Sequence, residues 1–265
     1  MRKYFTLTKA GILGALTFRL SLFVTFIGNI IYMIIIYFLW KAIFDSAPTG
    51  VVNGMTFSDT MIYLVLAGSM VSMVEVFLVW QMSRKVQQGT IVLDLLKPIR
   101  FGAYTFFSNT GEVVVRFFIV FLPTAIAVYF LSGCAIPLGL NLLLFLPSFI
   151  LGFLINYMIN MMIGTLCLFT QSSWGINIMK EVIISLLSGA SIPLVFFPDG
   201  IRVIVERLPF QSIYHTPLQM LLHNDLSVET IGKMYATQLM WVVVLFAGAT
   251  LFWKWSLNKI TVNGG

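Results

Sequence analysis

The sequence contains little charge. Only 10% of its 265 residues are Asp, Glu, Lys or Arg, whereas 59% are hydrophobic and the mean hydropathy is +0.95. Because soluble domains carry about 25% charged residues, this composition excludes a large soluble domain and predicts an all-α, polytopic integral membrane protein. The formal net charge is +6, but the basic residues stand at the ends of apolar runs instead of clustering, so no nucleic-acid partner is expected.

Motifs for nucleotide binding and for catalysis are missing as well. No G-x-x-x-x-G-K-[ST] phosphate loop occurs, so the chain cannot bind ATP by that route. Its two cysteines, Cys134 and Cys167, make no disulfide framework. The two histidines, His215 and His223, have no carboxylate or cysteine placed beside both, which favours polar packing residues over metal ligands. The sequence therefore predicts no enzyme activity, no catalytic residue, no metal site and no cofactor in this chain.

Long apolar runs account for most of the chain. A spanning helix needs about 20 apolar residues. The Gly and Pro of SGCAIPLG, at 132–139, mark a turn that divides the longest uncharged run into two spans. Six spans are predicted, near residues 20–44, 60–82, 111–131, 141–169, 178–196 and 233–254.

The lysines and arginines predict the orientation. With a cytoplasmic N-terminus, eleven of them, Lys180 included, fall in inside segments and four in outside segments. Because cytoplasmic loops are enriched in these residues, both termini are expected to be cytoplasmic, in a multi-pass protein of the plasma membrane.

The first 18 residues have two possible interpretations. Arg2 and Lys3 precede apolar residues, as in a signal peptide. However, Lys9 interrupts the apolar part and no small-x-small cleavage site follows. An amphipathic helix that lies on the inner leaflet and leads into the first span is favoured.

Two further stretches carry the functional argument. SRKVQQGTIVLDLLKPIRFG, at 83–102, is a charged loop between two spans. As one helix, residues 84–96 would turn Val86, Ile91 and Leu95 toward the bilayer, and Pro98 would end the helix. Its cations would contact either anionic lipid headgroups or another protein chain.

The second stretch is GASIPLVFFPDGIRVIVERLPFQSIYHTPLQMLLH, at 189–223. Its prolines divide an apolar segment on the outer side. Broken backbone at membrane depth needs protein or a water-lined cavity to satisfy its polar groups, so short helices that dip into the outer leaflet are expected. A packed extracellular loop is the plainer alternative.

Both stretches resemble the membrane subunits of ABC-2 type ABC transporters, in particular the six-span permeases of about 260 residues. One pattern of the resemblance is Gly89, Ile91 and the run Leu95 to Pro98; the other is IPLVFFP followed by LPF and a later proline. The resemblance extends along nearly the whole chain, as one permease domain over 1–265. Its expected parts are an interfacial helix, spans one and two, a coupling loop, spans three to five, an extracellular cap and span six, at 1–19, 20–82, 83–100, 105–196, 197–225 and 230–257.

The resemblance implies two sites. The coupling loop would dock onto a separate ATPase through Arg84, Lys85, Gln88, Gly89, Ile91, Asp94, Lys97 and Pro98. The cap would consist of short re-entrant helices shaped by Pro193, Phe197, Pro198, Pro209, Phe210 and Pro217. It also implies the partners: two copies of an ABC ATPase that hold ATP and Mg, and a second permease that is the same or a related chain.

Three ionisable residues are expected inside the membrane: Glu75, Glu112 and Arg116. Such groups are costly in a bilayer and are usually paired. A structural clasp between Glu75 and Arg116 is favoured over a proton or substrate site at Glu75.

The sequence therefore predicts a permease subunit of an ATP-driven exporter. Aromatic and Met residues of the first two spans suggest a lipophilic or amphipathic cargo, although lipid contact explains most of them. A stand-alone secondary transporter or channel is the alternative, and it would need inverted repeats and broken helices near the midplane.

Overall fold

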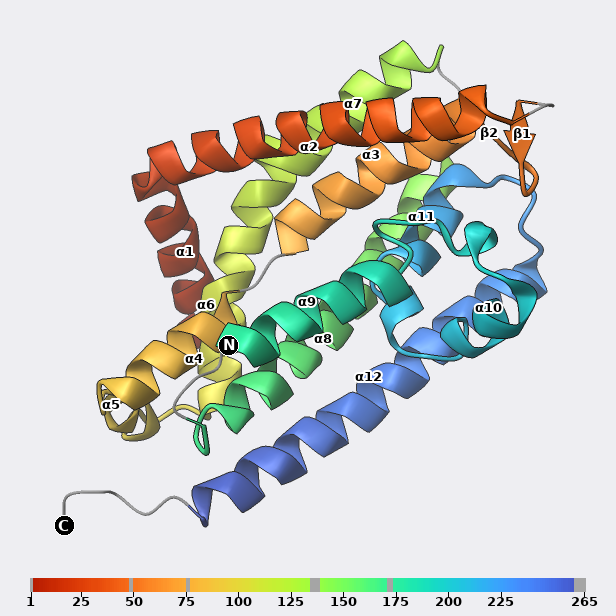
Figure 1. Cartoon of the computed structure of the whole chain (residues 1–265). Helices are drawn as coiled ribbons and strands as arrows, with labels where there is room; N and C mark the ends of the chain where they lie inside the picture. Colours follow the sequence, from red (N-terminus) through yellow and green to blue (C-terminus); the bar gives the residue numbers. More distant parts are fainter. Residues whose placement is uncertain (1, 48–49, 75–76, 134–138, 171–173, 260–265) are drawn as a thin grey trace.

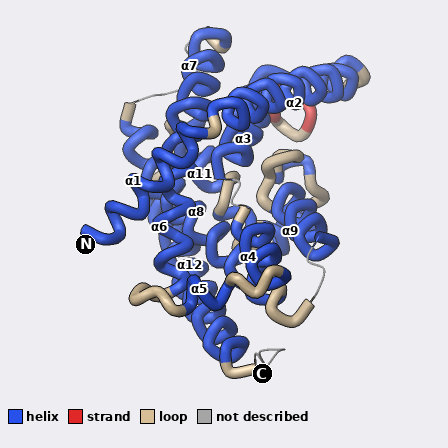
Figure 2. The backbone as a smooth tube through the Cα atoms, turned by 90° about the vertical axis from the view of Figure 1, so that its left-hand side faces the viewer, coloured by secondary structure: helices blue, strands red, loops and turns tan. Residues whose placement is uncertain are grey.

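The computed structural model describes residues 2–47, 50–74, 77–133, 139–170 and 174–259. Within these ranges the chain is almost entirely helical, with one short hairpin (Figures 1 and 2). The elements in chain order are α1 (Arg2–Thr17), α2 (Arg19–Asp45), β1 (Val51–Val52), β2 (Met55–Thr56), α3 (Phe57–Val74), α4 (Leu78–Gln87), α5 (Ile91–Leu95), α6 (Phe101–Arg116), η1 (Phe117–Phe121), α7 (Leu122–Leu131), α8 (Leu140–Leu166), α9 (Trp174–Leu187), η2 (Leu194–Phe196), α10 (Asp199–Val205), η3 (Phe210–Ser212), α11 (His215–Leu222) and α12 (Val228–Leu257).

Five helical stretches in the described ranges are long and apolar enough to cross a bilayer, which confirms an all-α membrane protein. They are Leu20–Asp45, Phe57–Gln87, Phe101–Leu131, Leu140–Leu166 and Val228–Leu257. The second and third are longer than the sequence predicted, because α4 continues the second to Gln87 and α6 starts the third at Phe101. Only residues 88–100 remain between these two spans.

The predicted fifth span is shorter than expected. Its helix, α9, has 14 residues and ends at Leu187, followed by Gly189 with a φ of +79°. At 1.5 Å per residue, 14 residues reach about 21 Å, whereas the hydrocarbon core is about 30 Å thick. The six-span count therefore stays a prediction.

The predicted N-terminal helix exists as α1, and it packs closely on α6 (Figure 1). Two glycines allow the approach: a Cβ on Gly11 would lie 2.2 Å from the Ser108 carbonyl oxygen, and one on Gly111 would lie 2.4 Å from the Thr8 carbonyl oxygen. Small residues at such crossings are typical of packing in membranes, where helices gain little from hydrophobic burial.

Buried polar groups hold the remaining helices together. Gln238 of α12 is fully buried, and its Nε2 donates to the carbonyl oxygens of Ser148 on α8, at 3.0 Å, and Ser212 of η3, at 2.9 Å. Asn141 donates to the carbonyl oxygens of Leu221 and His223, which joins α8 to the end of α11. These bonds fix α12 and the segment after α9 against α8.

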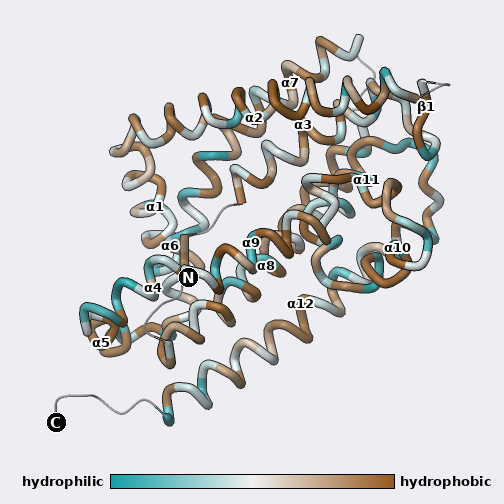
Figure 3. Tube along the Cα trace, viewed as in Figure 1, coloured by the Kyte–Doolittle hydropathy of each residue, from teal (hydrophilic) through white to brown (hydrophobic). Residues whose placement is uncertain are grey.

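Hydrophilic residues concentrate at two ends of the bundle (Figure 3). One group surrounds α4 and α5, and the other lies in the connections near α10. The helix α3 lies in the interior, with Leu66, Ala67 and Met70 fully buried, whereas α2 and α12 expose most of their apolar side chains. The exposed apolar surface is the face that lipid or another membrane chain would cover.

Candidate functional site

The tip of the bundle consists of α4, α5 and the chain that connects them. A single helix over 84–96 was predicted, and this is wrong. The helix ends because Gly89 adopts a φ of +70°, a left-handed conformation that side chains disfavour, and the Gly89 amide donates to the Val86 carbonyl oxygen at 3.0 Å. The chain therefore folds back before α5 begins at Ile91.

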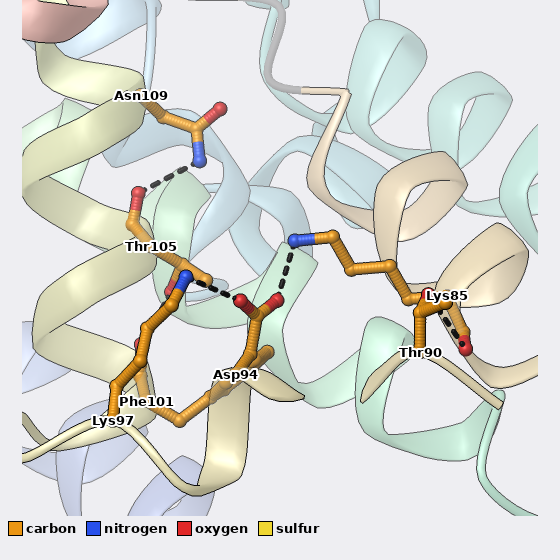
Figure 4. A network of polar contacts seen from close by, with 7 residues as sticks. All are labelled: Lys85, Thr90, Asp94, Lys97, Phe101, Thr105 and Asn109. Carbon is orange, nitrogen blue, oxygen red and sulfur yellow. Dashed lines mark hydrogen bonds and ion pairs between the residues drawn. The ribbon is translucent and has the colours of Figure 1, made fainter. Parts of the chain in front are cut away.

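A buried carboxylate stabilises the tip. The Asp94 side chain is 7% exposed and lies between two ammonium groups: Lys85 Nζ is 2.5 Å from Oδ2 and Lys97 Nζ is 2.6 Å from Oδ1 (Figure 4). Burial raises the pKa of Asp94, but the hydrogen bonds and charges of Lys85 and Lys97 outweigh it and lower that pKa below its usual value. The residue predicted to meet a partner thus serves inside the tip, as its brace.

Further contacts attach the tip to the long helices. Lys97 Nζ lies 3.9 Å from the centre of the Tyr104 ring on α6. Tyr157 Oη of α8 donates to the Gly102 carbonyl oxygen at 2.8 Å. Phe101 stacks on Trp253 of α12, with ring centres 4.6 Å apart. A displacement of the tip would therefore act on α6, α8 and α12 together.

The outer surface of the tip is apolar at α5 and polar beside it. Leu93 and Leu96 are 64% and 76% exposed, and Val92 is exposed beside them. The prediction that Ile91 faces the bilayer is wrong, because its side chain is buried in the protein core. Around α5, four predicted coupling residues are exposed: Arg84, Gln88, Gly89 and Pro98.

A second polar group lies in the interior, where the second and third spans are irregular. Arg116 is 4% exposed; its Nη2 is 2.6 Å from Glu112 Oε1, and its Nη1 donates to the Ser72 carbonyl oxygen at 2.8 Å. A π-helix, η1, begins at the next residue, and such bulges in α-helices often mark functional sites. The predicted clasp partner Glu75 lies outside the described residues, so the pairing of Glu75 with Arg116 stays a prediction.

A third polar group connects α8 with α9. Lys180 is 8% exposed and donates to Asn160 Oδ1 at 2.8 Å. Asn160 donates to the Asn156 carbonyl oxygen at 2.9 Å, and Asn156 donates to the carbonyl oxygen of Val74, the last residue of α3, at 3.2 Å. Lys180 was counted among the inside-loop cations, but it lies within α9. Its signal in the sequence was a cation followed at once by an apolar run, which is also how the end of a span looks.

The segment after α9 forms the short helices that were expected. The prolines explain the breaks: Pro198 precedes α10, Pro209 precedes η3, and Pro217 lies in the first turn of α11, where no intrahelical N–H bond is lost. Pro193, Pro209 and Pro217 are buried, Phe197 and Phe210 are half-buried, and Pro198 is exposed.

The expected shielding of this segment is correct for α11 and wrong for α10. Leu218 and Met220 are fully buried, but Ile201, Val203 and Ile204 are 50%, 50% and 62% exposed. A single turn or two of helix can bury only one face, and α10 uses Val205 for that face.

The histidine of this segment packs as a polar residue. His215 Nδ1 is 3.1 Å from Tyr63 Oη of α3. Burial, followed by the positive charges of Arg202 and His223, lowers the pKa of His215 to about 4. Among the described residues, no group of three or more His, Cys, Asp or Glu is placed to hold a metal ion.

The family follows from a comparison with known protein families. The family described as ABC-2 family transporter protein matches residues 30–264. Comparison with curated proteins and with solved structures returned no match. The family match takes in every long helix except the start of α2, together with the tip, both interior polar groups and the segment after α9. The chain therefore belongs to the ABC-2 family of transporter membrane proteins.

Proposed function

We propose that the chain is the permease subunit of an ATP-driven exporter that works with a second permease and two copies of an ATPase subunit. The observation that carries this proposal is the tip: a braced, exposed short helix at one end of a membrane bundle, in a chain of the ABC-2 family. In this arrangement the tip faces the cytoplasm and docks into the ATPase. Both chain ends are then cytoplasmic, and the host membrane is the plasma membrane.

The contacts of the tip support transmission of force. ATP binding and hydrolysis by the partner would move the ATPase subunits against α5. Because Asp94 fixes α5 to both flanking segments, and Phe101 stacks on Trp253, the movement would pass to α6 and α12 as a rigid-body tilt. The pathway would open between the two permeases, with a lipophilic or amphipathic molecule as cargo.

The tip also indicates what the ATPase must offer. Leu93 and Leu96 stand out from a surround that includes exposed Arg84 and Arg100. A matching groove needs an apolar floor for the two leucines and acidic residues at its rim. A short helix that lies in an apolar groove is a common mode of recognition.

The first test is co-purification. The chain, tagged and extracted in mild detergent from its own host, should bring down a protein with a Walker A motif, and the complex should hydrolyse ATP. Leu93→Asp should abolish the co-purification, whereas Leu131→Asp, at the far end of the third long helix, should leave it intact. If the wild-type chain purifies alone and ATP hydrolysis is absent, the proposal is wrong.

A stand-alone secondary transporter is the second candidate, and one observation favours it. Arg116 and Lys180 are buried cations inside the bundle, next to interruptions of the helices. Proton- or ion-coupled transporters use such charges and such broken helices. Transport by the purified chain in vesicles under a proton gradient, without ATPase or ATP, would select this candidate.

A further inference from the structure

A pocket of about 420 Å³ lies between α8, α9 and the residues around the end of α3. Its polar wall consists of Asn156, Asn160, Lys180, Glu181 and Ser185. Its other lining residues include Val71, Phe77, Val182 and Leu186, which are apolar. A volume of this size falls in the range of small-molecule sites, which are commonly apolar with a few fixed polar groups.

The cation on this wall is positioned by the protein. Lys180 is 8% exposed, and its Nζ donates to the neutral amide oxygen of Asn160 at 2.8 Å, whereas the Glu181 carboxylate is 3.8 Å away. Glu181 is 46% exposed and accepts a hydrogen bond from Asn177 at 2.5 Å, so its carboxylate is directed to a neighbour on its own helix.

The two amides are held in turn by the backbone. Asn160 donates to the Asn156 carbonyl oxygen, and Asn156 donates to the Val74 carbonyl oxygen. These bonds leave Asn160 Oδ1 as the atom that faces the ammonium, and they fix the position of Lys180 on the pocket wall. An ammonium can donate three hydrogen bonds and binds carboxylate or phosphate as a point charge.

We infer that this pocket binds the anionic headgroup of an amphiphile, a carboxylate or phosphate, with Lys180 as the residue that binds the anion. The apolar walls at Phe77, Val182 and Leu186 would contact the first part of the acyl or aromatic chain. The inference rests on the proposed permease function and deepens it, since it narrows a lipophilic or amphipathic cargo to an anionic one. It also gives a role to a cation that is costly to keep inside a membrane.

The test is a binding measurement on the permease–ATPase complex in phosphatidylcholine nanodiscs, with radiolabelled oleate as the probe and oleyl alcohol as its uncharged match. Wild-type complex should bind oleate saturably. Lys180→Met should weaken oleate binding at least about tenfold, because a charge-assisted hydrogen bond is lost. Lys180→Arg should restore most of the affinity, and binding of oleyl alcohol should be insensitive to both variants.

Two further variants keep the outcome clear. Lys233→Met removes a cation that is 74% exposed on α12, and it should leave oleate binding unchanged. Val182→Trp narrows the pocket from an exposed position without touching the polar contacts, so it should weaken oleate binding even if Lys180→Met fails to fold. Competition by phosphatidylglycerol would assign the site to a bilayer lipid, and absence of competition would assign it to a single-chain cargo; both keep the anionic headgroup.

The inference is wrong if Val182→Trp and Lys180→Met both bind oleate as the wild type does, or if oleate and oleyl alcohol lose affinity alike. The proposed function is judged separately, because co-purification of the ATPase and its hydrolysis of ATP do not depend on oleate. A complex that hydrolyses ATP but does not distinguish oleate from oleyl alcohol would overturn this inference and leave the permease proposal standing.

Discussion

Replacement of Asp94 by Asn tests whether the tip is braced as the structure indicates. The substitution keeps the size of the side chain and removes the negative charge between Lys85 and Lys97, which lie at 2.5 and 2.6 Å. Asn also offers only one acceptor oxygen, so one lysine loses its partner entirely. The local free energy that holds α5 against α4 and α6 should fall.

The geometry sets the size of the effect. A hydrogen bond to a charged group contributes about 1.5–3 kcal/mol when it is buried. The Asp94 side chain is 7% exposed, but those of Lys85 and Lys97 are 34% and 38% exposed, so water weakens both pairs toward the value of about 1 kcal/mol or less typical of surfaces. Loss of one pair and weakening of the other should cost about 1–3 kcal/mol locally.

Hydrogen exchange of the α5 amides measures this cost directly. Since each 1.4 kcal/mol is a factor of ten, exchange at 91–95 should accelerate by about 5- to 150-fold in Asp94→Asn. Glu229→Gln is the matched control, because its ion pair with Lys233 is equally short, at 2.6 Å, but 77% and 74% exposed; exchange there should hardly change. Unchanged exchange at 91–95 in Asp94→Asn would refute the brace.

Three other predictions use the stability of the purified chain. Gly111→Ala should lower the free energy of unfolding by about 1–3 kcal/mol, since its Cβ would meet backbone of α1, whereas Gly102→Ala on the same helix, with nothing within 4 Å, should not destabilise. With a pKa of about 4, His215 stays neutral in the folded chain, so stability should fall between about pH 6.5 and pH 4; His215→Gln should flatten this pH dependence, and equal slopes would count against it. If Glu75 pairs with Arg116, either single neutralisation should cost more than the double replacement, and additive losses in a double-mutant cycle would exclude the pair.

The sequence predicted the main helices well, because long apolar runs have few alternatives in a membrane protein. Lipid offers no partner for backbone polar groups, so an apolar run of 25 to 30 residues must be helical. The breaks after α9 were also predictable, since Pro193, Pro198 and Pro209 each exclude a continuing helix.

The tip was predicted in position but not in conformation. Gly89 was recognised as an interruption, yet a single glycine in a helix costs only about 1 kcal/mol and does not by itself decide between a helix and a turn. What decides here is tertiary: Asp94 is buried between Lys85 and Lys97, and this arrangement requires the chain to reverse at Gly89.

The interior polar groups were the least predictable part. Lys180 was placed in a loop because a cation at the start of an apolar run usually ends a span. Its actual partner, Asn160, is 20 residues away on a different helix. Contacts at that distance depend on how α8 and α9 pack, and no local pattern in the sequence encodes it.

The central claim, that the tip docks on an ATPase, is tested most directly by site-specific crosslinking in the native membrane. A photoreactive amino acid at Leu93, which is 64% exposed on α5, should yield an adduct with a protein that contains a Walker A motif. The same group at Leu131, 87% exposed at the far end of the third long helix, should yield no such adduct. An ATPase adduct from position 131, or none from position 93 in a membrane that contains the assembled transporter, would contradict the account.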